Sequence, residues 1–353
     1  MKELSFTITV SMISYNDEKI LEECLASVRS QDYNQELIDI LLIDGGSTDA
    51  TLEVARKYGA TVIYRPDLRD VPYVRGGMAF TMPKTDLILF FSADNRLQEQ
   101  DTLSRMVETF VDEDTVGCET LRYGYRETDP AISRYFALIG GADPIAVGLG
   151  KADRAPYDAR KWHSFGEAED CGSYYKVRFS NDVSKIPTLG ANGFLFRRKL
   201  AENSRFALHA VHTDMCLDLI RQGHNQFVFV KHKHVIHFIN VSLSSFIKRR
   251  LHYEQMYSCE NISRVYSVFQ KKDLPRLLYV IVSYSTLVIP AMRALKGYLF
   301  VRDPAWFLHP IMCCLFTLSY SFHFIRRGLS LKPHQKILDS HLVQQLKRKT
   351  GKM

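Results

Sequence analysis

The amino-acid sequence predicts an α/β protein in which a mostly parallel, Rossmann-like sheet is flanked by helices. Three observations lead to this prediction. Apolar strands alternate with helical segments in the first third of the chain, the strands are continuously apolar, and a polar cluster follows each of several strands. Continuous apolar strands are typical of a parallel sheet that helices cover on both faces. The carboxyl ends of such strands form the ligand crevice of an α/β sheet.

The strand and helix units follow one another from the start of the chain. Residues 4–13 are rich in β-branched side chains and predict the first strand, and apolar positions at helical spacing between 20 and 28 predict the first helix. The segments that continue the pattern are a strand at 38–43, a helix at 48–58, a strand at 60–64 and a strand at 87–91. The polar clusters at strand ends are residues 14–17, 44–49 and 92–95.

Regular patterning then weakens. Residues 119–182 are rich in Tyr, Asp, Gly and Arg, and we expect an irregular region there that faces a substrate, because long irregular stretches in compact domains are usually functional. Order is expected to return with residues 187–198, followed by a helix around 214–222 and a strand at 227–230. Residues 1–240 are therefore predicted to form one domain.

Composition excludes several classes of protein. The sequence has 46 Lys and Arg against 39 Asp and Glu, a net charge of +7, with 46% apolar, 24% charged and 12% aromatic residues. These values exclude a disordered tail protein, a collagen-like chain and a polytopic membrane protein. Seven scattered cysteines without a Cys-x-x-Cys pair indicate reduced thiols in the cytoplasm.

The excess positive charge is local. From residue 326 to the end, eight basic residues stand against one acidic residue, which accounts for the whole excess. This distribution argues against a nucleic-acid-binding face. It predicts a basic cytoplasmic tail at 327–353 that contacts anionic membrane lipids.

The sequence before this tail predicts contact with a membrane. Residues 241–272 interleave apolar and basic side chains, as amphipathic helices at an interface do. Within 273–326, residues 277–292 are uncharged over about 24 Å of helix, and 305–325 are long enough to span a bilayer. Both transmembrane and re-entrant helices are compatible with these segments. Basic residues on either side favour the cytoplasmic face for the preceding domain.

Two aspartates stand at predicted strand ends. Asp44 follows the second strand and Asp94 the fourth. Carboxylates there can hydrogen-bond a nucleotide or hold a divalent cation that bridges phosphate oxygens. Either aspartate alone is also an ordinary turn or cap residue, and it is their joint placement that favours a ligand site.

Six short motifs follow one another over residues 4–240. They are Ser14-Tyr15-Asn16, Asp44-Gly45-Gly46-Ser47-Thr48-Asp49, Arg75-Gly76-Gly77, Ser92-Ala93-Asp94, Gly190-Ala191-Asn192 and Thr213-Asp214. Their order resembles that of the inverting, nucleotide-sugar-dependent glycosyltransferases of family 2, which have the GT-A fold. Gly45, Ser92 and Thr213 depart from this pattern, because the family has aspartate, aspartate and glutamate at the matching positions.

The resemblance implies a role for each motif. The donor-binding residues would be Ser14, Tyr15, Asn16, Asp44, Arg75, Ser92, Ala93 and Asp94; the acceptor-binding residues would be Gly190, Ala191 and Asn192; Asp94 and His237 would hold Mg²⁺ or Mn²⁺. Asp214 would be the general base, because a sugar hydroxyl is a poor nucleophile and needs a group that takes its proton. A cation at Asp94 would stabilise the charge of the leaving diphosphate.

The resulting hypothesis is a membrane-bound inverting glycosyltransferase of the cytoplasmic face. It would transfer one sugar from a nucleotide-sugar donor, with UDP favoured over GDP, to a hydroxyl of a lipid-linked glycan acceptor in surface-polysaccharide assembly. Neither tryptophan follows an arginine, which argues against the Gln-x-x-Arg-Trp motif of processive synthases. Two alternatives stay open: an enzyme that glycosylates polyprenyl phosphate, and a non-catalytic membrane subunit with degenerate motifs.

Overall fold

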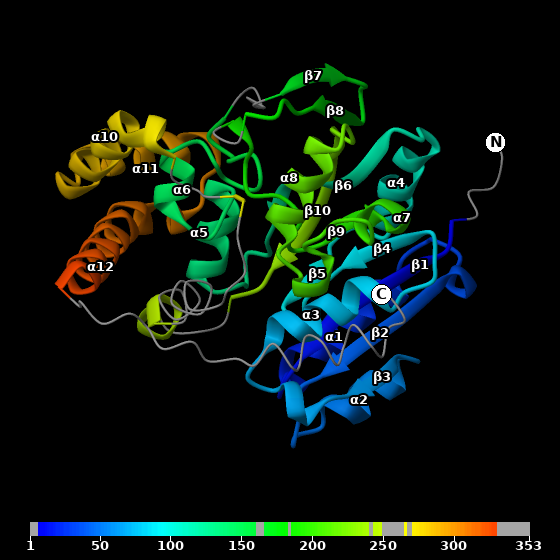
Figure 1. Ribbon diagram of the computed structural model, residues 1–353. Helices are drawn as coiled ribbons and strands as arrows, with labels where there is room; N and C mark the ends of the chain where they lie inside the picture. Colours follow the sequence, from blue (N-terminus) through cyan, green and yellow to red (C-terminus); the bar gives the residue numbers. More distant parts are fainter. Residues whose placement is uncertain are drawn as a thin grey trace.

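A ten-stranded mixed sheet forms the centre of the molecule (Figure 1). The computed structural model describes residues 6–159, 166–182, 185–239, 243–248, 265–266 and 270–329. The strands are β1 (Ile8–Ser14), β2 (Ile38–Asp44), β3 (Thr61–Tyr64), β4 (Leu87–Phe90), β5 (Asn95–Leu97), β6 (Thr115–Gly124), β7 (Glu167–Asp170), β8 (Tyr174–Arg178), β9 (Phe194–Arg197) and β10 (Gln226–His237). Their order is β3-β2-β1-β4-β9-β6-β10-β8-β7, and β5 pairs with β10.

Helices cover the sheet and form a separate layer beside it. They are α1 (Glu18–Arg29), α2 (Thr51–Lys57), α3 (Pro72–Thr81), α4 (Thr102–Glu108), α5 (Ala131–Ile139), α6 (Pro144–Gly148), α7 (Arg198–Ala201), α8 (His212–Arg221), α10 (Leu274–Ser285), α11 (Val288–Phe300) and α12 (His309–Leu329). Two short 3-10 helices are η5 (Ala207–His209), which follows α7, and η7 (Pro304–Leu308), which precedes α12.

The first half of the sheet confirms the predicted α/β fold. Strands β3, β2, β1 and β4 are parallel neighbours, and α1 and α2 connect the first three of them. The strand order reverses between β1 and β4, so a crevice is expected outside their carboxyl ends. The clusters at 14–17 and 92–95 both lie at this edge, as the sequence predicts.

The second half of the sheet contains both parallel and antiparallel neighbouring strands. Strand β9 lies antiparallel between β4 and β6, while β6 and β10 are parallel to each other. The sheet is therefore parallel in one half and mixed in the other, whereas the sequence predicts a mostly parallel sheet. Strand β10 also extends well past the predicted 227–230, through a register irregularity between Val230 and His234.

The region 119–182 is not irregular, which corrects the prediction. It contains most of β6, then α5, α6, β7 and β8. The sequence pattern did not predict these elements because they are short and carry no extended apolar period. The helix predicted around 214–222 begins two residues earlier, as α8, and the ordered stretch predicted at 187–198 contains strand β9.

Two apolar cores hold the sheet and its helices together. On one face, Leu21, Cys24, Leu25 and Val28 of α1 are buried against β1 and β2 in one cluster. On the other face, α8 packs against β6, β9 and β10 through a second cluster rich in phenylalanine. Burial on both faces explains the continuous apolar character of the strands.

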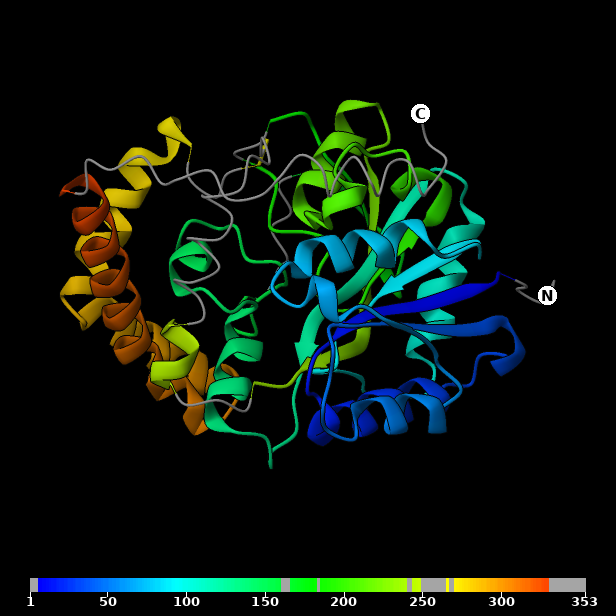
Figure 2. The same ribbon diagram turned by 60° about the horizontal axis from the view of Figure 1, so that its bottom comes forward.

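The helices α10, α11 and α12 form a layer on the far side of α5 and α6 from the sheet (Figure 2). Trp306 in η7 is fully buried in a core shared with α5 and α6. Arg134 of α5 forms an ion pair with Asp303 at 2.8 Å, and Arg293 of α11 pairs with Asp158 at 3.0 Å. The layer is thus attached to the sheet domain by both apolar and ionic contacts.

The predicted pair of membrane segments becomes three helices. Helices α10 and α11 meet at an angle of 84°, so they form a bent pair. In the described part of the chain, residues 304–322 make one helical stretch long and apolar enough to cross a bilayer, and the bent pair could make a second crossing. Of the predicted amphipathic region, residues 243–248 are helical, and residues 249–264 and the basic tail from 330 lie outside the described residues.

Two glycines in α3 allow η5 to approach the helix closely. A Cβ atom on Gly77 would lie 1.9 Å from the carbonyl oxygen of Leu208, and one on Gly76 would lie 2.5 Å from the Cβ of Ala210. The Arg75-Gly76-Gly77 sequence is therefore a packing requirement as well as a motif.

Gly77→Ala should destabilise the fold, because backbone rather than a flexible side chain occupies the space. We expect the free energy of unfolding to fall by about 1–3 kcal/mol, despite the higher helix propensity of alanine. Chemical denaturation followed by circular dichroism measures this. The control is Met82→Ala at the exposed end of α3. A Gly77→Ala variant as stable as the parent would contradict the packing argument.

Candidate functional site

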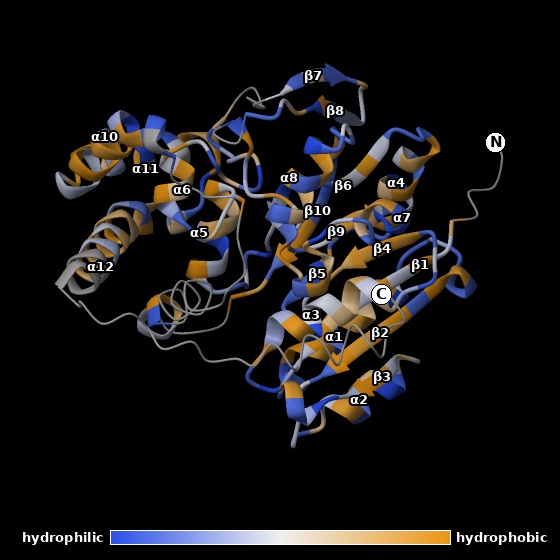
Figure 3. Ribbon diagram, viewed as in Figure 1, coloured by the Kyte–Doolittle hydropathy of each residue, from blue (hydrophilic) through white to orange (hydrophobic). Residues whose placement is uncertain are grey.

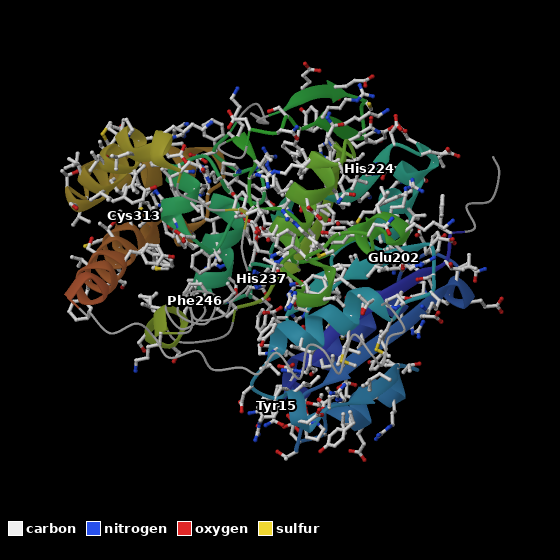
Figure 4. All side chains as sticks on the ribbon, viewed as in Figure 1. Tyr15, Glu202, His224, His237, Phe246 and Cys313 are labelled. Atoms are coloured by element: carbon white, nitrogen blue, oxygen red, sulfur yellow. The ribbon has the colours of Figure 1, made fainter. Side chains whose placement is uncertain are left out.

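The loops after β1 and β2 are joined by hydrogen bonds. The Asn16 amide donates to the Ser47 hydroxyl at 2.9 Å, and the Asn16 side-chain oxygen accepts from the Thr48 amide at 2.9 Å. Asn16 has φ +54°, a conformation that asparagine tolerates better than most residues. Tyr15, labelled in Figure 4, lies under the Arg69 guanidinium, 4.3 Å from the ring centre. The structure thus brings the first two predicted donor motifs together.

Asp44 is fully buried and caps its own turn. One carboxylate oxygen accepts from the amides of Gly46 and Ser47, each at 2.8 Å, and the other accepts from the Ser47 hydroxyl. These bonds hold the loop in shape. A direct donor contact by Asp44 stays a prediction.

Arg75 explains why glycine replaces the family's second aspartate. Its guanidinium donates to the Ser14 carbonyl at 2.5 Å and is buried. A Cβ atom on Gly45 would lie 2.6 Å from one of its nitrogens. The side chain of any other residue at 45 would displace the arginine, so glycine keeps a cation at the carboxyl end of β1.

Asp94 and His237 lie beside each other at the sheet edge. Strand β5 runs antiparallel to β10 and sets Asn95 opposite His237, and the Phe238 amide donates to the Asp94 carbonyl at 2.7 Å. The Asp94 carboxylate oxygen and His237 Nε2 are 3.4 Å apart. Burial lowers the pKa of His237, but the Asp94 carboxylate more than offsets this and raises it above its ordinary value.

This pair fits the donor set of a divalent cation. A carboxylate oxygen and an imidazole nitrogen are ordinary ligands of Mn²⁺, and both side chains are partly exposed. Among the described residues, no group of three or more His, Cys, Asp or Glu side chains could hold a metal. The protein would therefore supply two ligands, and a diphosphate and water would have to complete the shell.

Asp17 is a site residue that the sequence analysis missed. Its carboxylate accepts from the Ser14 hydroxyl at 2.7 Å and the Tyr15 amide at 3.1 Å. Burial raises the pKa of Asp17 to about 6, with the Asp94 charge adding to the effect. Its place immediately after Ser14-Tyr15-Asn16 was the available signal.

The predicted acceptor loop is held by a buried arginine. Arg154 donates to the carbonyl of Asn192 at 3.2 Å and forms an ion pair with Glu119 of β6, and both side chains are inaccessible to solvent. The side-chain amide of Asn192 donates to the Tyr123 hydroxyl at 3.0 Å, which in turn donates to Asp153. Gly190, Asn192 and Gly193 all have positive φ, so the loop makes a tight turn. No local pattern predicts the Glu119–Arg154 pair, because its members are 35 residues apart in the chain.

The start of α8 lies next to this loop. The Thr213 hydroxyl donates to the Leu189 carbonyl at 3.0 Å, so the departure from the family's glutamate has a structural role here. Asp214 is fully buried, and one carboxylate oxygen accepts from the amides of Val265 at 2.6 Å and Tyr266 at 2.9 Å. Its role as a general base stays a prediction.

A cavity of about 460 Å³ joins these parts. Its lining includes Ser92 and His237 from the metal side, Ala191 and Asn192 from the acceptor loop, and Tyr73 and Gly76 from α3. Further lining residues are Asp143, Asp153, His209, His212 and Thr213. The cavity can therefore hold a molecule between a candidate cation site and the acceptor loop. His237, which lines the cavity, contacts the Asp94 carboxylate at 3.4 Å.

Comparison with known proteins identifies relatives of this arrangement. Residues 9–203 match the family model described as glycosyl transferase family 2. One curated relative is the dolichyl N-acetyl-α-D-glucosaminyl phosphate 3-β-D-2,3-diacetamido-2,3-dideoxy-β-D-glucuronosyltransferase of Methanococcus voltae, 30% identical over 109 residues, which are 29% of this chain and 33% of that protein. Another is the 4,4'-diaponeurosporenoate glycosyltransferase of Staphylococcus aureus, 30% identical over 116 residues, 31% of this chain and 30% of that protein. The chain thus spans about a third of each relative's length.

Two solved structures are similar over most of the chain. The mannosyltransferase PcManGT from Pyrobaculum calidifontis, in complex with GDP-Man and Mn²⁺, has a TM-score of 0.49 at 12% identity and covers 92% of this chain and 88% of its own. TarS 1–349 of S. aureus, in complex with UDP, has a TM-score of 0.44 at 14% identity and covers 94% of each chain.

Asp17→Asn should change how stability depends on pH. The folded protein holds the Asp17 proton more tightly than the unfolded chain, because burial raises its pKa from 3.8 to about 6. The resulting stabilisation is present below about pH 4 and is lost as pH rises through about 6. Between pH 4 and 7 the unfolding free energy of the variant should therefore gain about 3 kcal/mol relative to the parent. Denaturation at several pH values, without nucleotide or metal, measures this, with the exposed Asp39→Asn as control. If the free energies of unfolding of variant and parent changed equally with pH, burial of Asp17 would not affect the pH dependence of stability.

Proposed function

Because the chain belongs to glycosyl transferase family 2, we propose that it transfers a single sugar, with inversion, from a nucleotide-sugar donor to a hydroxyl of a lipid-linked glycan acceptor. The observation that carries the proposal is the cavity shared by the Asp94–His237 edge and the acceptor loop. Such a cavity would hold the activated sugar with its diphosphate toward the sheet edge and the attacking hydroxyl toward residues 190–192. The product would serve the assembly of a surface glycan.

The donor side of the site supports a nucleotide diphosphate. Arg75 keeps a guanidinium at the carboxyl end of β1, and Asp94 with His237 supplies an oxygen and a nitrogen ligand nearby. Mg²⁺ or Mn²⁺ held there would stabilise the negative charge that forms on the leaving diphosphate. Ser14, Tyr15 and Asn16 would line the nucleotide side, and Ser92 and Ala93 the diphosphate side. We keep UDP as the favoured nucleotide.

The names of the relatives support a lipid-linked acceptor. One relative acts on a dolichyl-phosphate-linked sugar, and the other is named for a diaponeurosporenoate. Both names describe acceptors with long apolar chains. The matches cover about a third of each relative, so the acceptor class is a proposal for this chain.

The C-terminal helices offer a surface for the membrane that would hold such an acceptor. Of the 18 large apolar side chains that are exposed among the described residues, 15 lie between Leu274 and Phe322. In Figure 3 the ribbon of α10 carries several orange, hydrophobic stretches. On α12, Ile311, Leu318 and Phe322 lie about two turns and then about one turn apart and share the face opposite the buried Met312, Cys313 and Phe316. Phe307, in the preceding η7, is exposed as well. We call these 15 side chains the apolar face of α10–α12.

Basic residues accompany this apolar face. Lys272, Arg276, Lys296 and Arg302 are exposed on or beside the same helices. Apolar side chains flanked by basic ones favour a bilayer interface with anionic lipids. We therefore propose that the layer is embedded in the cytoplasmic leaflet and that the cavity takes its acceptor from there.

Asp94→Asn should abolish most of the transfer activity, since it removes the carboxylate ligand from the site. We expect kcat/KM with Mn²⁺ to fall at least about 100-fold, and His237→Ala to cause a smaller loss in the same assay. The assay follows transfer from labelled UDP- and GDP-sugars to membrane lipids. His234→Ala is the matched control, because His234 lies on the same strand and pairs with Glu99 instead. Full activity in the presence of EDTA would contradict a metal-dependent site.

Charges placed on the apolar face should release the protein from membranes. Leu295→Glu with Leu299→Glu should weaken binding to phosphatidylglycerol-containing vesicles at least about tenfold, because both side chains are exposed on α11. Vesicle flotation measures the bound fraction. Val111→Glu is the control, since Val111 is equally exposed on the sheet domain. Equal loss of binding in both variants would contradict a specific membrane face.

A further inference from the structure

The start of α8 presents one titratable side chain to the cavity, and it is not the predicted one. His212 is the first residue of the helix, is half-buried and lines the cavity together with Thr213. Asp214 is two residues further on and is fully buried. Because successive helical residues are about 100° apart, side chains at 212 and 214 point in nearly opposite directions. The two residues therefore do not face the same space.

The contacts of Asp214 are those of a structural residue. Its carboxylate oxygen accepts two backbone amide protons, from Val265 and Tyr266, and so holds the chain segment before α10 against α8. Tyr266 is itself buried and donates its hydroxyl to the Ile186 carbonyl at 3.0 Å. Truncating Asp214 to alanine would leave the buried amide of Tyr266 and the part-buried amide of Val265 without this acceptor, whereas asparagine would keep a neutral acceptor oxygen.

His212 is held against the acceptor loop. Gly190 has φ +92°, and a Cβ atom there would lie 2.9 Å from the Cβ of His212 and 3.1 Å from its carbonyl oxygen. On its other side, the imidazole lies 6.2 Å, centre to centre, from the Phe90 ring at the end of β4. His212 thus stands between the loop that would bind the acceptor and the strand end that leads to Ser92.

We infer that His212, rather than Asp214, takes the proton from the acceptor hydroxyl. The inference rests on the proposed glycosyl transfer. The acceptor oxygen forms a bond to the anomeric carbon as its O–H bond breaks and the proton passes to an imidazole nitrogen. The bond from the anomeric carbon to the diphosphate oxygen breaks with its electron pair, and the nucleoside diphosphate leaves. Imidazole is the commonest general base because it exchanges protons near neutral pH.

Variants at both positions test the inference. His212→Ala should lower kcat at least about 100-fold while the affinity for the nucleotide sugar stays within about threefold, and added imidazole should restore part of the activity. His212→Gln, of similar size, should show the same loss without rescue. Asp214→Asn should chiefly lower the midpoint of thermal unfolding. His224→Ala, at the exposed end beyond α8 (Figure 4), is the control and should retain parental activity.

The outcomes separate the inference from the proposed function. If the parent protein binds nucleotide sugars but transfers none, the proposed function fails. If the parent transfers sugar to a hydroxyl and His212→Ala retains its kcat, the inference fails while the proposed function stands. Rescue of Asp214→Ala by acetate, with no rescue of His212→Ala by imidazole, would also overturn the inference. Binding of the nucleotide sugar by each variant shows that it has folded.

Discussion

The antiparallel pairing of β5 with β10 is the constraint on which the site depends. These strands are far apart in the sequence, and their register sets Asn95 opposite His237, which brings the Asp94 carboxylate within 3.4 Å of an imidazole nitrogen. The same strand β10 continues beside β6, whose Glu119 holds Arg154 and, through it, the acceptor loop. The sheet thus fixes both the candidate cation site and the loop across the cavity from it.

Much of the fold could be predicted because burial on both faces leaves a direct pattern in the strands. The β1, β2 and β4 strands and the polar loops after them lie where apolar runs and turn residues indicate. Pairings between distant segments leave no such pattern. The antiparallel β9, the β5–β10 contact and the Glu119–Arg154 pair depend on register, which a local period does not contain. The order within 119–182 was missed for a different reason, because several of its elements are only four or five residues long.

The motifs predict which loops lie together better than they predict where each side chain points. Ser14, Asn16, Asp44 and Arg75 lie in one connected group, as their motifs predict. At α8, however, His212 lines the cavity, whereas Asp214, two residues later, accepts hydrogen bonds from backbone amides. Asp17 and His212 have no motif of their own; the contacts of Asp17 with Ser14 and Tyr15, and the place of His212 in the cavity lining, are visible only in the structure.

The proposed function requires that Asp94 and His237 together hold a cation that binds the donor diphosphate. Electron–nuclear double resonance of Mn²⁺ bound to the full-length protein, with ¹⁵N-labelled histidine and UDP, tests it most directly. We expect hyperfine coupling of the metal to one histidine nitrogen and to phosphorus, and we expect the nitrogen coupling to be absent in His237→Ala. Mn²⁺ that couples to phosphorus but to no histidine nitrogen in the parent protein would contradict it.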